Sequence, residues 1–197
     1  MKKILICFMT TVIFAGIITF VLSNNLREVN TVLDEYYTEY MPKNTGNIEI
    51  FKQERLGEYT FVLAEKYPGE GEASIDLFII NSNNDIVAVS TTDRAPSTCY
   101  TANSFIWEEY QVIFGELKDT KYNQVSEQME QVDLKSLNVV FKTGEVIEKN
   151  IEGLEIFTII SDVKDEISEV NVYNEEHEIV SDLSETIYQR LDLTLLK

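Results

Sequence analysis

The sequence predicts a mainly β protein: an antiparallel β-sandwich or barrel-like domain preceded by an N-terminal transmembrane helix and a short helical stalk. An uncharged, mostly apolar run covers residues 4–22, and apolar side chains at helical spacing follow it. From residue 48 the apolar period changes to two, in short β-branched and aromatic runs separated by Asn, Asp, Gly and Pro. We therefore divide the chain into a signal-anchor or signal peptide (1–23), a helical stalk or linker (24–46) and one extracytoplasmic β-rich domain (47–197).

The first segment has the pattern of a membrane anchor. Its 19 apolar residues, 4–22, would rise roughly 28 Å as a helix, close to the roughly 30 Å hydrocarbon core of a bilayer. Lys2 and Lys3 precede the run, which places the N-terminus in the cytoplasm and the C-terminal domain outside. We expect a single-pass protein of the cell membrane; the alternative is a secreted protein released by cleavage near Ser23.

A helical face follows the apolar run. Its apolar residues recur at spacings of three and four: Leu26, Val29, Leu33, Tyr36 or Tyr37, and Tyr40. Pro42 and the Asn-Thr-Gly sequence after it end the pattern. This face has two interpretations: it packs on the outer domain, or it pairs two chains as a stalk.

The strands of the outer domain are expected in ten runs of apolar, β-branched and aromatic residues. They are 48–52, 59–63, 75–80, 86–90, 99–107, 110–117, 136–141, 146–151, 154–160 and 169–173. Residues 142–145 have the composition of a hairpin turn. Residues 123–133 are polar and fit either a short helix or a loop, and residues 184–195 fit either a helix or a strand.

Charge limits the classes of partner. The whole chain has a net charge of −18; residues 1–23 hold two of its 16 basic residues and none of its 34 acidic ones, so the exported part carries about −20. Such a field disfavours nucleic acid and anionic lipid headgroups and attracts cations or a basic protein surface. We expect contact with the membrane through residues 4–22, an envelope or membrane protein as partner, and no nucleic acid.

Cys99 is the first candidate for chemistry. The only other cysteine, Cys7, lies inside the apolar run, so the outer domain is expected to have no disulfide. The Ser-Thr-Cys sequence ending at Cys99 resembles that of the sortase transpeptidases, whose cysteine sits in a Thr-Cys pair. The catalytic histidine of that family precedes the cysteine, whereas here the only histidine, His177, follows it. We predict no catalytic residues; the alternative is a cysteine enzyme using Cys99 with His177 and Arg94 or Arg190.

No cofactor or metal is predicted. Residues 81–85 place oxygen ligands at alternate positions, but Ile86 and Thr92 stand where a calcium loop has Gly and Glu. Glu116 and Asp119 form a carboxylate pair in sequence, with nothing to place them across a cleft. Trp107 anchors a peptide or glycan ligand if it is exposed and is a core residue otherwise.

Residues 94–103 and 110–119 together resemble a loose group of short, leader-bearing surface proteins of Gram-positive bacteria. That resemblance implies a surface location and a β fold, and no activity. The function expected from the sequence is protein or ligand interaction, or sensing, by an extracytoplasmic domain anchored at the cell envelope, without catalysis. The alternative is the exported, sortase-like enzyme.

Overall fold

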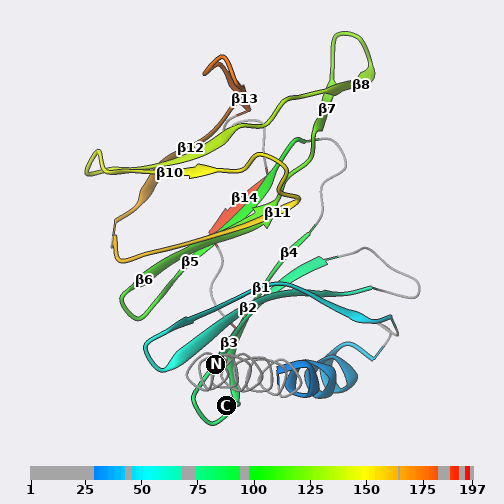
Figure 1. Ribbon diagram of the computed structural model, residues 1–197, viewed down its shortest axis with the longest axis vertical. Coiled ribbons are helices and arrows are strands. Elements are labelled where there is room, and N and C mark those ends of the chain that lie inside the picture. Colours follow the sequence, from blue (N-terminus) through cyan, green and yellow to red (C-terminus); the bar gives the residue numbers. More distant parts are fainter. Residues whose placement is uncertain are drawn as a thin grey trace, which may run out of the picture.

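In the part of the chain that it describes, the computed structural model shows four stacked layers, one helix and three mainly antiparallel sheets (Figure 1). It describes residues 29–42, 46–67, 74–93, 98–163, 165–181, 187–190 and 194–195. The predicted mainly antiparallel β fold is confirmed. The described chain contains no helix that is both long and apolar enough to cross a membrane. The predicted span 4–22, the cleavage site near Ser23 and Arg94 lie outside the described residues.

The first sheet lies next to the helix. Its strands, in spatial order, are β1 (Ile48–Leu56), β2 (Tyr59–Lys66), β3 (Ser74–Ile80), β4 (Ile86–Asp93) and β15 (Thr194–Leu195). β1 to β4 form a meander of consecutive antiparallel pairs. β2 and β3 are covered on both faces, which explains why their sequences are nearly continuous apolar runs.

The middle sheet has the order β11 (Ile156–Ser161), β6 (Tyr110–Glu116), β5 (Thr101–Trp107) and β14 (Ile187–Arg190). β14 is the exception to the antiparallel pattern, because it runs parallel to β5. In β6, a Cβ on Gly115 would lie 1.8 Å from the backbone oxygen of Thr101. Only glycine fits there, because any side chain would collide with the backbone of the neighbouring strand.

The third sheet has the order β10 (Val146–Asn150), β9 (Ser136–Phe141), β12 (Ile167–Tyr173) and β13 (Ile179–Ser181). The predicted turn at 142–145 joins β9 to β10 and is confirmed: Gly144 has a φ of 87° and donates its N–H to Phe141. A separate two-stranded hairpin, β7 (Thr120–Asn123) and β8 (Gln128–Gln131), projects from the body at the top of Figure 1.

Three cores separate the four layers. Alternation along β2 supplies two of them, because Phe61 and Leu63 face the middle sheet while Val62 and Ala64 face the helix. The third core lies between the middle and third sheets and contains Phe157. Polar bonds also join the layers. Asn103 donates to the Thr91 carbonyl and joins the middle sheet to the first sheet. The Tyr100 hydroxyl donates to the Val170 carbonyl of the third sheet.

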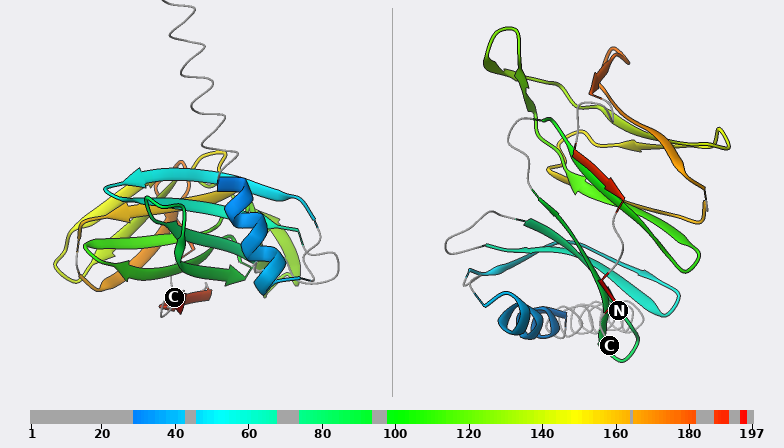
Figure 2. Two further views of the ribbon diagram at one scale, coloured as in Figure 1. Left: turned by 90° about the horizontal axis from the view of Figure 1, so that it is seen from below. Right: turned by 180° about the vertical axis from the view of Figure 1, so that it is seen from behind.

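The helix, described over residues 29–40, lies across the outer face of the first sheet (Figure 2, left). Val29, Leu33 and Tyr37, members of the predicted apolar face, are buried against this sheet. Of the two interpretations of that face, the structure therefore shows packing on the domain. The chain leaves the helix at Met41 and Pro42, where the predicted stop lies.

Two segments whose secondary structure the sequence does not decide contain strands in the structure. Within 123–133 the structure has the β7–β8 hairpin and not a helix. The described parts of 184–195 are β14 and β15. The apolar period is absent from β8 because all four of its side chains are exposed.

Candidate functional site

Of the candidate catalytic residues, the structure describes the side chains of Cys99 and His177, and their settings differ. Cys99 is 0% exposed and belongs to the core between the middle and third sheets. His177 is exposed on the turn between β12 and β13, where its φ is 60°. Arg94 lies outside the described residues, and of Arg190 only the backbone in β14 is described. The thiol therefore lies in the core, and the imidazole lies on a surface turn.

The other candidates have structural surroundings. Trp107 is half-buried beside the core and meets Tyr59 edge-to-face, with ring centroids 5.4 Å apart. In the loop of residues 81–85, the side-chain oxygen of Asn81 accepts N–H bonds from Asn83 and Asp85, so this oxygen stabilises the turn. In the described part of the chain, no three acidic, histidine or cysteine side chains converge as metal ligands.

A cleft of about 710 Å³ opens at one end of the middle sheet. Four separate parts of the chain line it: the end of β6 with the segment after it, the end of β8 with the segment after it, the β10–β11 loop, and the β12–β13 turn. The lining residues are Glu116, Leu117, Lys118, Asp119, Gln131, Val132, Asp133, Leu134, Ile151, Glu152, Gly153, Leu154, Glu155, Ile156 and Glu175.

Backbone hydrogen bonds hold these loops in place. Leu117 donates to the Glu155 carbonyl at 2.7 Å, which joins the exit of β6 to the start of β11. Val132 donates to the Asp119 carbonyl at 2.6 Å and closes the base of the β7–β8 hairpin. Ile151 donates to the Lys135 carbonyl at 3.0 Å. The cleft is therefore formed by paired backbone and not by free loops.

The cleft has an apolar floor. Leu117, Val132 and Ile151 line it and are also members of the core between the middle and third sheets. Leu154, at the cleft edge, is 41% exposed. A ligand in the cleft therefore meets aliphatic surface as well as charge.

The charge of the lining is strongly negative. Six lining residues are acidic and one, Lys118, is basic. The Lys118 ammonium nitrogen lies 3.0 Å from a carboxylate oxygen of Glu116, the last residue of β6. The remaining acidic side chains of the lining are exposed; they are Asp119, Asp133, Glu152, Glu155 and Glu175.

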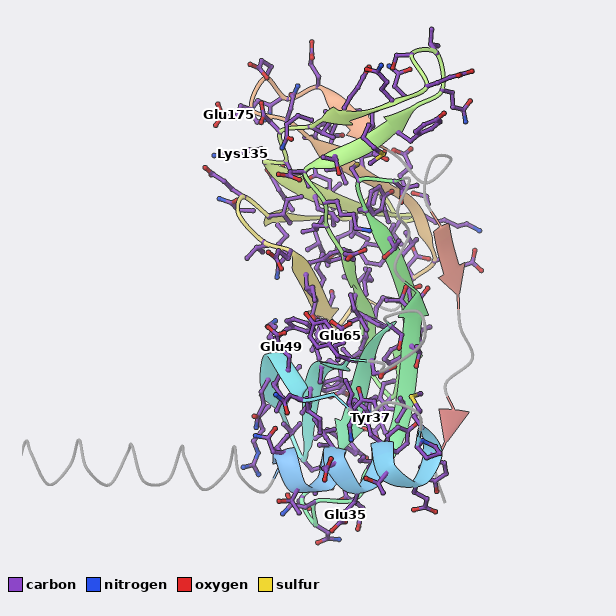
Figure 3. All side chains as sticks on the ribbon, turned by 90° about the vertical axis from the view of Figure 1, so that its right-hand side faces the viewer. Glu35, Tyr37, Glu49, Glu65, Lys135 and Glu175 are labelled. Carbon is purple, nitrogen blue, oxygen red and sulfur yellow. The ribbon has the colours of Figure 1, made fainter. Side chains whose placement is uncertain are left out.

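Lys135 bonds one of these carboxylates at the cleft margin. Its ammonium group donates to Glu152, and this hydrogen bond, together with the charge of Glu152, raises the pKa of Lys135. Figure 3 shows Lys135 and Glu175 close together at the end of the molecule that carries the hairpin. The charge of Glu175 also favours the protonated lysine. A cation at this margin is thus already stabilised by two carboxylates of the lining.

The sequence indicates only two of the cleft residues as a candidate pair. The carboxylate pair Glu116 and Asp119 does lie in one cavity. The acids at 133, 152, 155 and 175 come from three other segments, and no spacing in the sequence relates them. Among the lining residues there is no histidine, cysteine, serine or threonine. The lining therefore offers negative charge and aliphatic surface, the features that bind a basic and partly apolar ligand.

A second, smaller groove of about 490 Å³ lies between the helix and the β3–β4 loop. Tyr36 and Tyr40 line it with their rings stacked 4.9 Å apart, and Glu35, Glu39 and Asp85 add negative charge. This groove is acidic like the cleft, but its apolar lining includes aromatic side chains, which the cleft lining does not.

The helix is fixed beside this groove by a buried carboxylate. Asp76 of β3 accepts hydrogen bonds of 2.6 Å from the Tyr37 hydroxyl and from the Thr91 hydroxyl. Burial raises the pKa of Asp76, and the two hydrogen bonds oppose that rise. Burial and the charge of Asp76 raise the pKa of Tyr37 well above its usual value. Figure 3 shows Tyr37 directed from the helix toward the sheet and Glu35 on the opposite side.

Comparison with known proteins adds no assignment. No family model matches the chain, and neither the curated proteins nor the solved structures contain a significant match to it.

Proposed function

We propose that this protein is an interaction domain, held at the outer face of a membrane, that binds a basic protein segment in the acidic cleft. The observation that carries the proposal is the lining itself: six carboxylates and one lysine around an aliphatic floor. Lysine and arginine side chains combine an aliphatic stem with a charged head and suit such a surface. A basic segment of an envelope or membrane protein is therefore the expected partner.

The location belongs to the same proposal. The apolar run 4–22 behind Lys2 and Lys3 favours a single-pass anchor with the β domain outside. The net charge of −18 favours a basic partner over nucleic acid. Binding is preferred to catalysis because the cleft lining holds no histidine, cysteine, serine or threonine, while Cys99, on which the alternative enzyme depends, is 0% exposed.

A binding assay with charge-neutralised variants tests this function. The full chain in nonionic detergent is titrated into a fluorescent peptide with four lysines in a Gly-Ser background, and fluorescence anisotropy is measured. The cleft variant carries Asp119→Asn, Asp133→Asn and Glu155→Gln. The control carries Glu49→Gln, Glu145→Gln and Glu148→Gln, which are exposed acids outside the cleft. Both variants lose the same net charge.

We expect the cleft variant to bind about tenfold more weakly than the wild type, because three exposed ion pairs together contribute roughly 1–2 kcal/mol. The control should stay within about twofold, and binding should weaken as the salt concentration rises. Equal losses in both variants would reduce the interaction to nonspecific charge attraction and contradict the proposal. Failure of the lysine peptide to bind the wild type would do the same.

A further inference from the structure

The tip of the β7–β8 hairpin carries the most exposed large apolar side chain in the part of the chain that the structure describes. Val125, in the turn, is 95% exposed. Behind it Tyr122 and Met129 are 42% and 49% exposed. A two-stranded ribbon is only marginally stable by itself, and exposed apolar side chains add nothing to its stability. The hairpin must therefore be held by other contacts, and its apolar side chains are available to a partner.

Polar contacts hold the tip. The side-chain oxygen of Asn123 accepts N–H bonds from Val125 and Ser126 at 2.8 and 3.2 Å. One carboxylate oxygen of Glu130 accepts bonds from the Asn123 amide and the Ser126 hydroxyl. These four bonds fix the turn, so its surface is organised before any partner binds.

The two faces of the ribbon differ. Lys121 lies on the inner face, where its ammonium group donates to the Val180 carbonyl of β13 at 2.7 Å. Tyr122 and Met129 are directly opposite each other in the antiparallel register, so they lie side by side on the other face. An aromatic ring beside a thioether forms an adaptable apolar surface.

This outer face is continuous with the acidic cleft. Thr120 and Gln131 are the next pair on the same side of the ribbon as Tyr122 and Met129, because alternate residues of a strand share a face. Gln131 also lines the cleft, as do Asp119 and Val132 at the base of the hairpin. A segment leaving the cleft along Gln131 therefore reaches the Tyr122–Met129 pair next.

We propose that the Tyr122–Met129 face is a second contact for the partner bound in the cleft, and that it takes a large apolar side chain adjacent to the partner's basic residues. This inference rests on the proposed function and specifies the partner: a protein segment with lysine or arginine followed by an aromatic or aliphatic anchor. Charge decides among possible occupants. A second copy of this chain would bring another net charge of −18 to the cleft, and an anionic bilayer would be repelled in the same way.

Two peptides and two double variants test the inference. One fluorescent peptide carries four lysines followed by Phe-Leu, and the other has Gly-Ser in place of Phe-Leu. The hairpin variant is Tyr122→Thr with Met129→Thr, which retains β propensity. The control is Ile106→Thr with Val146→Thr, which also removes two exposed apolar side chains but from β5 and β10. All proteins are full-length in the same nonionic detergent, so that partitioning of the apolar peptide into micelles cancels between them.

We expect the wild type to bind the Phe-Leu peptide about fivefold more tightly than the Gly-Ser peptide, as partial burial of two apolar side chains implies. The hairpin variant should lose this preference and still bind the Gly-Ser peptide as the wild type does. The control should keep the preference. Hydrogen exchange at the Val132 amide, which donates to Asp119, shows whether the hairpin base stays paired in each variant.

The outcomes separate the two proposals. A wild type that binds both peptides equally would overturn the hairpin contact and leave the cleft as the binding site. The hairpin contact would also be overturned if the hairpin variant still preferred the Phe-Leu peptide while its Val132 amide stayed protected from hydrogen exchange. If neither peptide binds, the proposed function fails, and the hairpin contact fails with it. A conservative variant, Tyr122→Phe with Met129→Leu, should bind like the wild type; loss of the preference there would also contradict an apolar contact.

Discussion

The helix-covered end and the cleft end of the molecule contain the same chemical group, the carboxylate, in opposite settings. Under the helix, Asp76 is buried and both of its oxygens accept hydroxyl bonds. Around the cleft, Asp119, Asp133 and Glu155 are exposed over an aliphatic floor. The first arrangement stabilises one packing of the helix, and the second leaves negative charge available to a ligand. Substitutions should therefore affect folding at one end and binding at the other.

The largest difference in unfolding free energy between the two ends is expected when apolar side chains are truncated. Leu33→Ala, in the helix–sheet core, should lower the free energy of unfolding by about 3 kcal/mol, because it leaves a cavity at a residue that is fully buried. Tyr122→Ala, on the hairpin, should change it by less than about 0.5 kcal/mol. Chemical denaturation of both variants measures the contrast, and similar losses would mean that the hairpin belongs to the cooperative core.

Next in size is the hydroxyl bond to the buried carboxylate. Tyr37→Phe should cost about 2 kcal/mol of unfolding free energy, because it removes one of two donors to Asp76 and leaves the carboxylate buried. Tyr40→Phe is the matched control on the exposed side of the same helix. Equal unfolding midpoints for the two variants would show that the Tyr37 bond has no part in holding the helix.

A smaller effect is expected from pH. Burial raises the pKa of Asp76 in the folded protein above the ordinary 3.8, so the folded state holds this proton more tightly than the unfolded state. The stability that follows is fully present below pH 3.8 and is lost as pH rises through the raised value. The free energy of unfolding of the wild type minus that of Asp76→Asn, measured by chemical denaturation from pH 4 to 8, should decline as pH rises. A difference that does not change with pH would contradict the raised pKa of the buried Asp76.

The smallest effect belongs to the ion pair at the helix margin. Lys66 donates to Asp34 at 2.9 Å, but the Asp34 side chain is 66% exposed and screened by solvent. Asp34→Asn should lower the unfolding free energy by at most about 0.5 kcal/mol, and added salt should reduce the difference further. A loss above about 2 kcal/mol would place this pair with the buried network and not with the surface.

The same contrast explains what the sequence could predict. The strands β2 and β3 were predictable because their alternate side chains fill two cores, which requires long apolar runs such as residues 75–80. The β7–β8 hairpin was not, because polar bonds from Asn123 and Glu130 hold it and leave no apolar period. Of the cleft carboxylates, the sequence indicates only Glu116 and Asp119 as a pair. The others meet through tertiary pairing, such as the bond from Leu117 to Glu155, which no local pattern records.

The pairing of β14 with β5 and of β15 with β4 has a consequence for how the chain reaches this structure. Residues 187–190 pair with 101–104, and residues 194–195 pair with 88–89, so two sheets receive their last strand from a segment distant in sequence. Such contacts form slowly, since a long loop must close first. Until then β4 and β5 are open edges, able to pair with the same strands of another molecule. The newly made chain is thus most prone to aggregation in the interval before these two short strands are in place (Figure 2, right).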